Sequence, residues 1–191
     1  MKRVRAGAAM RALVSILFLA CATTKSATLV PDRLRGTDDA VHELGPSGSD
    51  AYTVLIFFSA GCHVLEAHDE RLAHLYAEFA PKGVRFLGVD PEPNATVWRD
   101  RDEARRRGYR FPILLDQGAA LARAFGADFA GLAIVLDRSA HVVYRGGIDS
   151  DRAHLTDDAA PYLQHALADL LEGKPPRDNG TKVMGCALRT W

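Results

Sequence analysis

The spacing of apolar residues along this chain alternates between the period of a strand and the period of a helix. Residues 54–58 (VLIFF) form a continuous apolar run of β-branched and aromatic side chains, which predicts a strand buried on both faces. Over residues 62–80 the apolar side chains recur at helical spacing, and Pro81 ends the pattern. This helical stripe consists of Leu65, Leu72, Leu75, Tyr76 and Phe79. We therefore predict a buried strand followed at once by a long helix.

Strands and helices continue to alternate toward the C-terminus. The pattern predicts strands at residues 84–89 and 113–115, helices at 96–107 and 119–125, a β-hairpin at 132–136 and 141–144, and a helix from Pro161 to Gly173. Helices between strands imply parallel pairing, and the hairpin adds antiparallel edges. This order predicts an α/β, thioredoxin-like fold, in which helices flank a central mixed β-sheet. A C-terminal β-hairpin plus helix and an extended tail complete it.

The first 20 residues have the pattern of an export signal. A basic segment with four Lys or Arg residues precedes nine mostly apolar residues at 12–20, a run too short to span a bilayer. Cys21 follows, and residues 17–21 (LFLAC) resemble a bacterial lipoprotein box, in which the cysteine carries lipid. We expect an exported protein, either periplasmic or anchored to the membrane through lipid on Cys21. Ordinary secretion stays open as the alternative.

These features divide the chain into four parts. We expect a signal peptide at residues 1–20, a tether and irregular lead-in at 21–50, a thioredoxin-like domain at 51–173 and a tail at 174–191. Within the lead-in, one short strand is predicted around residues 41–44.

The composition is that of a globular protein and excludes several classes. Of the 191 residues, 48% are apolar and 25% are charged, which argues against disorder. The 24 Lys and Arg balance the 24 Asp and Glu, and loss of residues 1–20 leaves a formal charge of −4. A basic surface for nucleic acid is therefore not expected. The three cysteines are too few for a disulfide scaffold, and no two have the C-x-x-C spacing.

The residue best placed for chemistry is Cys62, where the buried strand meets the long helix. The first N–H groups of a helix lack partners within it and carry positive partial charge, which favours a thiolate. Cysteines in such positions have pKa values lowered to roughly 3.5–7.5, and His63 is a candidate to add positive charge. The alternative interpretation is a small buried side chain with no reactivity.

Several segments together resemble a known family. They are residues 57–65 (FFSAGCHVL), 107–116 (RGYRFPILLD), 143–149 (VYRGGID), 170–175 (LLEGKP) and 185–189 (GCALR). In order and spacing they resemble bacterial peroxiredoxin-like redoxins of the AhpC/TSA grouping, over about residues 50–191. The resemblance implies a thioredoxin fold and thiol redox chemistry at Cys62 without a cofactor. It also implies a protein disulfide or a peroxide as substrate and a thiol as reductant.

The sequence departs from this family's pattern at three positions. Leu65 stands where thioredoxins carry their second cysteine, and Ser59 stands where peroxiredoxins carry a threonine, with no proline between it and Cys62. Gly131 falls where a cis-proline is expected to face the active cysteine. Because glycine does not lock the backbone as proline does, the substrate loop around Gly131 is expected to be softer.

Cys186 is the candidate resolving cysteine. If Cys21 is lipidated or removed, only Cys62 and Cys186 remain, and Leu65 leaves no local partner. The glycines and prolines of the tail would let Cys186 travel to Cys62. Two alternatives stay open, namely a docked apolar plug at residues 185–188 and a Cys186–Cys186 bond between subunits. Arg145 is a secondary candidate near the site, with a salt bridge to Asp149 or Asp151 as the competing prediction.

Two other functions remain open at this point. Leu65 and Gly131 favour a thioredoxin-fold binding module that has lost catalysis. A copper-type or zinc site made by Cys62, His63 and a distant histidine is the third interpretation, although the spacing favours no metal.

Overall fold

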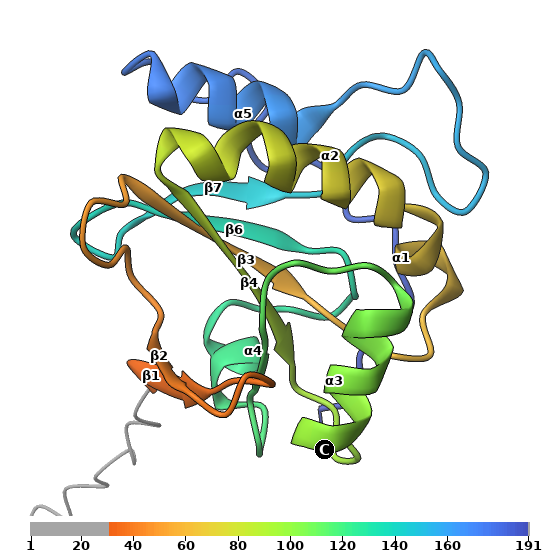
Figure 1. The fold of residues 1–191 in the computed structure, drawn as a ribbon. Helices are drawn as coiled ribbons and strands as arrows, with labels where there is room; N and C mark the ends of the chain where they lie inside the picture. The colour runs from red at the N-terminus through yellow and green to blue at the C-terminus, as the bar shows by residue number, and fades with distance from the viewer. Residues whose placement is uncertain (1–30, 191) are drawn as a thin grey trace, which may run out of the picture.

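A five-stranded mixed sheet organises the computed structural model, which describes residues 31–190 (Figure 1). The strands lie in the order β5-β4-β3-β6-β7, in which β3, β4 and β5 are parallel and β6 and β7 are antiparallel to their neighbours. Their bounds are Tyr52–Phe57 (β3), Val84–Asp90 (β4), Ile113–Leu115 (β5), Ala133–Leu136 (β6) and Val142–Gly146 (β7). The predicted α/β fold with a mixed sheet is confirmed.

The central strand β3 is buried on both faces, as its continuous apolar run predicts. Val54, Leu55 and Phe57 are fully buried, and β3 pairs with β4 on one side and with β6 on the other. A strand in this position sits at the centre of the core, so its C-terminal end is held firmly. Cys62 follows that end by five residues.

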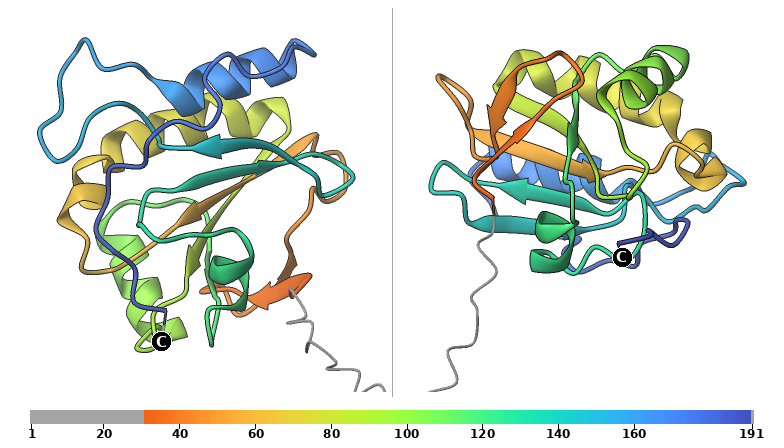
Figure 2. Two further views of the ribbon diagram at one scale, coloured as in Figure 1. Left: turned by 180° about the vertical axis from the view of Figure 1, so that it is seen from behind. Right: turned by 90° about the horizontal axis from the view of Figure 1, so that it is seen from below.

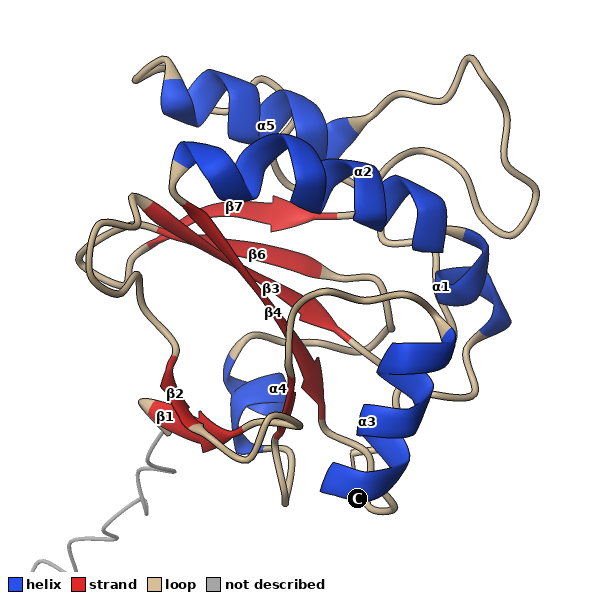
Figure 3. Ribbon diagram, viewed as in Figure 1, coloured by secondary structure: helices blue, strands red, loops and turns tan. Residues whose placement is uncertain are grey.

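Helices cover both faces of the sheet (Figures 1 and 3). The helices α2 and α5 lie side by side on one face, α4 lies on the other, and α3 lies next to α1 beyond the C-terminal ends of the parallel strands. Within the described residues, no helix is both long enough and apolar enough to cross a membrane. The helices are His63–Ala67 (α1), Asp69–Phe79 (α2), Val97–Arg106 (α3), Ala120–Ala124 (α4) and Tyr162–Leu171 (α5), with a 3-10 turn at Ala80–Lys82.

The long helix predicted at residues 62–80 is interrupted at His68, which separates α1 from α2. The buried His68 ring pairs through Nδ1 with the Val64 carbonyl at 2.7 Å and through Nε2 with Asp149 Oδ1 at 3.1 Å. These two bonds hold His68 outside the ideal helical conformation, at φ −90° and ψ 6°. The apolar stripe alone carries no sign of this break, because it continues through both helices.

The lead-in before the domain is more ordered than predicted. The strand expected around residues 41–44 is present as β2 (Val41–Glu43), but it pairs with a second strand that was not predicted, β1 (Arg33–Arg35). The turn of this hairpin docks on β5, where Thr37 N donates to the Ile113 carbonyl and Thr37 Oγ1 accepts from Ile113 N. The hairpin thereby covers an edge strand that would otherwise expose free N–H and C=O groups.

The C-terminal tail returns across the molecule to the start of α1. After α5 it runs past β7 and the 126–131 loop and ends beside α3 (Figure 2). Thr181 contacts the β7 end, Ala187 pairs with Phe129 in an antiparallel bridge, and Leu188 is buried. This path brings Cys186 to Cys62 across 124 positions of sequence.

Candidate redox site

Cys62 lies at the N-cap position of α1 and is fully buried. Its Sγ accepts two backbone hydrogen bonds at 3.3 Å, one from Leu65 N and one from Cys186 N. The first is the bond that an N-cap side chain makes with its helix. The second comes from the tail. The sulfur of Cys62 thus sits between a helix N-terminus and the residue that the sequence predicts as its resolving partner.

The lowered pKa predicted for Cys62 is wrong for the protein with its tail docked. Burial is the main cause that raises the pKa of the Cys62 thiol above its ordinary value, and the adjacent Cys186 thiol raises it further. The N–H groups of Leu65 and Cys186 act in the opposite direction without cancelling the effect of burial. The helix terminus favours the thiolate, but the tail, which is distant in sequence, contacts the sulfur and adds to its burial.

The tail holds Cys186 in place through its backbone. The Cys186 carbonyl accepts from Ala130 N at 2.9 Å, and Leu188 N donates to the Asp128 carbonyl at 2.9 Å. Gly185 is packed so closely that a Cβ atom there would collide with the Ala130 carbonyl. Cys186 itself is half-buried. Residues 185–188 are docked, as one of the alternatives in the sequence analysis proposed. This docking brings Cys186 to Cys62.

Gly131 lies beside Leu65, the position of the missing second cysteine. It adopts a left-handed backbone with φ +86°, and a Cβ atom there would lie 3.8 Å from Leu65 Cδ1. Its N–H donates to the Phe57 carbonyl at 2.8 Å, and residues 31–190 contain no cis peptide bond. The tail pairs with Ala130, next to Gly131. The protein's own C-terminus therefore occupies the edge at which an extended substrate was expected.

The other two candidate residues lie away from the sulfur or in another role. His63 is exposed on α1, whereas Cys62 is buried. Arg145 makes neither of the salt bridges predicted for it, since its guanidinium donates to the carbonyls of Phe125 and Gly126. Arg71 of α2 makes these two salt bridges instead, with Asp149 and Asp151.

The apolar pattern of the sequence gave no sign of a buried network around His68. Arg71 Nη1 donates to Asp149 Oδ2 at 2.5 Å, and the other Asp149 oxygen pairs with His68. Burial opposes charge on His68, but Asp149 more than offsets this, so the pKa of His68 is raised. Burial likewise works to raise the pKa of Asp149, and the pairs with His68 and Arg71 lower it overall. The network ties the α1–α2 junction to the segment after β7.

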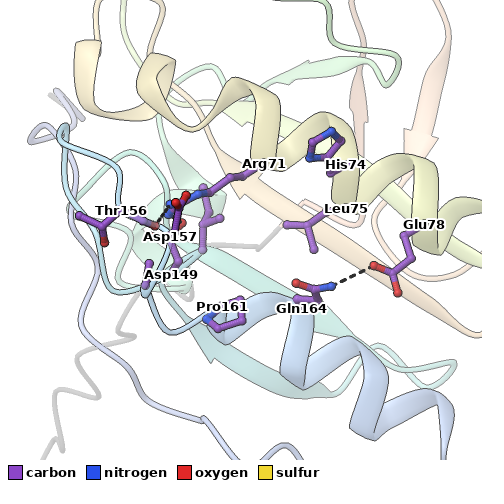
Figure 4. Close-up of a pocket in the computed structure, with 11 residues that line it drawn as sticks. Arg71, His74, Leu75, Glu78, Asp149, Thr156, Asp157, Pro161 and Gln164 are labelled. Carbon is purple, nitrogen blue, oxygen red and sulfur yellow. Dashed lines mark hydrogen bonds and ion pairs between the residues drawn. The ribbon is translucent and has the colours of Figure 1, made fainter.

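A pocket of about 360 Å³ opens beside this network, between α2, α5 and the 149–161 loop (Figure 4). Arg71 and Asp149 form one end, and a hydrogen bond from Gln164 to Glu78 closes the other. None of its lining residues is a site residue predicted from the sequence. Arg71 is already paired with Asp149 and Asp151, so its charge is taken up within the protein.

A second buried cluster holds three carboxyl groups near the end of β4. Asp90 and Asp100 are fully buried, and burial raises their pKa values to about 8 and about 6. Arg99 lies 3.9 Å from Asp90 and 3.8 Å from Asp100, while Glu92 lies 3.5 Å from Arg189 of the tail. The sequence shows acidic residues at the end of β4 and after it, but no local pattern indicates that they are buried.

The metal interpretation finds no support in this geometry. Within residues 31–190, no three His, Cys, Asp or Glu side chains gather in a way that would hold a metal ion.

Comparison with known proteins assigns the chain to a family. Residues 32–148 match the AhpC/TSA family, a range that includes Cys62 and ends before Cys186. The chain belongs to the AhpC/TSA family. The resemblance noted in the sequence is thereby confirmed, and redoxin-type thiol–disulfide oxidoreductase chemistry is supported.

Individual proteins resemble this chain in sequence or in structure. The thiol-disulfide oxidoreductase ResA of Halalkalibacterium halodurans is 29% identical over 133 residues, which cover 68% of this chain and 72% of that protein. An uncharacterized conserved protein from Geobacillus kaustophilus has a similar structure, with a TM-score of 0.75 at 28% identity over 85% of this chain and 89% of that one. PrxQ from Xylella fastidiosa shares the fold, with a TM-score of 0.54 at 15% identity over 77% and 89% of the two chains.

Proposed function

We propose that this protein is an exported thiol–disulfide oxidoreductase in which Cys62 reacts with the substrate and Cys186 resolves the intermediate. The observation that carries the proposal is the hydrogen bond from Cys186 N to Cys62 Sγ. The backbone nitrogen of Cys186 lies 3.3 Å from Cys62 Sγ. Because the cysteine side chain is short, the sulfur of Cys186 also lies near that of Cys62. The family supplies the class of chemistry, and the tail supplies the second thiol that Leu65 removes from the helix.

The reaction then proceeds by two exchanges. The Cys62 thiolate attacks one sulfur of a substrate disulfide, and the other substrate sulfur leaves as a thiolate that takes up a proton. The Cys186 thiolate next attacks Cys62 Sγ in the mixed disulfide and releases the first substrate sulfur. The substrate gains two electrons and two protons, and the enzyme ends with a Cys62–Cys186 disulfide. A thiol reductant returns both cysteines to the reduced state.

Burial of Cys62 determines the order of events. Because its sulfur is covered, the tail must move aside before a disulfide can reach it. Departure of the tail returns Cys62 to water and removes the main cause of its raised pKa, while the Leu65 N–H remains to stabilise the thiolate. Return of the tail delivers Cys186 to the mixed disulfide. One movement thus controls both activation and resolution.

The test compares the wild-type protein with Cys62→Ser and Cys186→Ser, with insulin as disulfide substrate and cumene hydroperoxide as peroxide substrate. We expect wild-type protein to reduce insulin, Cys62→Ser to be inactive, and Cys186→Ser to accumulate a mixed disulfide at Cys62. Peptide mapping without reductant identifies each linkage. Peroxide consumption without insulin reduction would instead assign a peroxidase. Loss of neither activity in Cys62→Ser would exclude the proposal, and a wild type inactive toward both would favour the lapsed binding module.

Export is part of the same proposal, and residues 1–20 and Cys21 lie outside the described residues. The basic segment, the short apolar run and Cys21 support it. We expect intact-mass analysis of the membrane fraction to find a chain that begins at Cys21 and carries lipid. A Cys21→Ser variant should be exported without the lipid. A cytoplasmic protein that retains Met1 would contradict export.

A further inference from the structure

A cleft of about 460 Å³ lies beside the tail, next to Gly185, the residue before Cys186. Its walls come from the tail at residues 181–185, the 126–132 loop, Arg145 of β7 and Arg152 of the segment after β7. Its volume falls in the range of roughly 300–1,000 Å³ that is typical of small-ligand sites.

Cationic side chains dominate the walls of this cleft. Arg145, Arg152 and Lys182 line it, and none of the three has a carboxylate partner within residues 31–190. Asp128 is the one acidic side chain of the lining, so the cations are in excess. Most other arginines of the described chain are paired with carboxylates, as Arg71 is. An excess of unpaired cations in a concave surface favours an anionic occupant.

The cleft also has a fixed orientation and an apolar contact. The Arg145 guanidinium is held by a 2.9 Å bond to the Gly126 carbonyl, so it is oriented before any ligand binds. Phe129 is 43% exposed and offers a face against which a short carbon chain can pack. The site therefore combines charge recognition with one apolar surface.

We propose that this cleft binds the reductant of the enzyme, a small thiol that carries carboxylate groups, in the manner of glutathione. The inference rests on the proposed function, because it concerns reduction of the Cys62–Cys186 disulfide. Cys186 is half-buried whereas Cys62 is fully buried, so the sulfur that an incoming thiolate reaches first is that of Cys186.

Two thiol molecules reduce the Cys62–Cys186 disulfide in two exchange steps. The bound thiolate attacks Cys186 Sγ, the S–S bond breaks, and Cys62 leaves as a thiolate stabilised by the Leu65 N–H before it is protonated. A second thiol molecule then attacks the sulfur of the first thiol in this mixed disulfide, and Cys186 leaves as a thiolate that takes up a proton. Two thiols become one disulfide, and their two electrons and two protons reside on Cys62 and Cys186.

The experiment oxidises the full-length mature protein with diamide and then measures the rate at which thiols reduce it. Glutathione is compared with its glycine ethyl ester, which retains the thiol but lacks one carboxylate. Each rate is divided by the rate at which the same thiol reduces a small reference disulfide. We expect glutathione to react on the order of tenfold faster than the ester at low salt, with the advantage reduced at high salt. Arg152→Gln and Lys182→Gln should each remove most of it.

Two controls separate the cleft from general effects. Arg105→Gln removes an exposed arginine of α3 that does not line the cleft, and it should leave the preference unchanged. Reduction by the neutral dithiothreitol should be equal in all variants. Equal rates with glutathione and its ester would overturn this inference alone. The same holds if an acidic thioredoxin, and not glutathione, reduces the protein in a way that depends on Arg152 and Lys182. Failure to form any Cys62–Cys186 disulfide would overturn the proposed function instead.

Discussion

At the scale of single residues, two opposing influences act on the Cys62 sulfur. Its position at a helix N-terminus favours the thiolate, and its burial under the tail favours the thiol. Burial is the larger effect, so the pKa is raised. A thiol that is protected in the resting protein and activated when the tail leaves is less exposed to adventitious oxidation.

The first prediction concerns the alkylation of Cys62 by iodoacetamide. In wild-type protein the rate should stay below that of a free peptide thiol at pH 7 and rise only above about pH 8.5, the ordinary cysteine pKa. Mass spectrometry of the Cys62 peptide as a function of pH measures this directly. A rate that already reaches its plateau near pH 6 would show that burial does not control the group.

The second prediction uses the glycine before Cys186. In Gly185→Ala the new methyl group collides with the Ala130 carbonyl, so the tail must shift away from the 128–130 segment. We expect Cys62 to be alkylated several times faster at pH 7, because the sulfur becomes less buried and its pKa falls. The Cys62–Cys186 disulfide should form more slowly. Ala187→Ser, which changes an exposed side chain of the same tail, should behave like the wild type.

At the scale of elements, the break between α1 and α2 depends on one buried network. Asp149 accepts from His68, which lies at the break, and from Arg71 in the first turn of α2. Removing the carboxylate leaves the buried Nε2 of His68 without its acceptor, whereas the half-buried Arg71 keeps Asp151. Breaking a buried pair in this way is more costly than its presence is stabilising.

The third prediction is that Asp149→Ala destabilises the protein by about 3–5 kcal/mol in urea unfolding at pH 7. Asp149→Asn keeps a hydrogen-bond acceptor and should lose less. The control is Asp157→Ala, which removes an exposed carboxylate of the same loop and should change stability by less than about 0.5 kcal/mol. Equal losses in Asp149→Ala and Asp157→Ala would show that the network contributes little.

At the scale of the whole molecule, the carboxyl groups buried near β4 make stability depend on pH. Burial raises the pKa of Asp90 to about 8 and that of Asp100 to about 6, whereas carboxyls of an unfolded chain titrate near pH 4. Between pH 4 and 8 the folded protein therefore holds protons that the unfolded chain has released. Stability must fall as the pH rises through this window.

The fourth prediction follows from that sign. The melting temperature should be several degrees higher at pH 5.5 than at pH 8.5. Asp90→Asn resembles the protonated form and should reduce this difference, mainly by stabilising the protein at pH 8.5. Asp102→Asn, an exposed change on α3, should leave the difference intact. A difference that is the same in Asp90→Asn and in the wild type would contradict the assignment.

The sequence alone determined the order of elements and the fold class. The β3 run, the helical stripe after it and the β6–β7 hairpin are local patterns, and each reports its own burial through its periodicity. The position of Cys62 between a strand and a helix follows from the same patterns. Thiol redox chemistry followed from the motifs around it, which the AhpC/TSA match supports.

Only the tertiary structure decided how the site is covered and what joins it. His68 interrupts the predicted helix because of Asp149, a partner 81 positions away. The β1–β2 hairpin forms where an edge strand needs cover. Arg145 donates to nearby carbonyls, and Arg71 rather than Arg145 pairs with Asp149. The pKa of Cys62 rises because a tail 124 positions distant lies over its sulfur. Local patterns measure the tendencies of neighbouring residues, whereas burial and pairing across the fold depend on segments that meet only after the chain has folded.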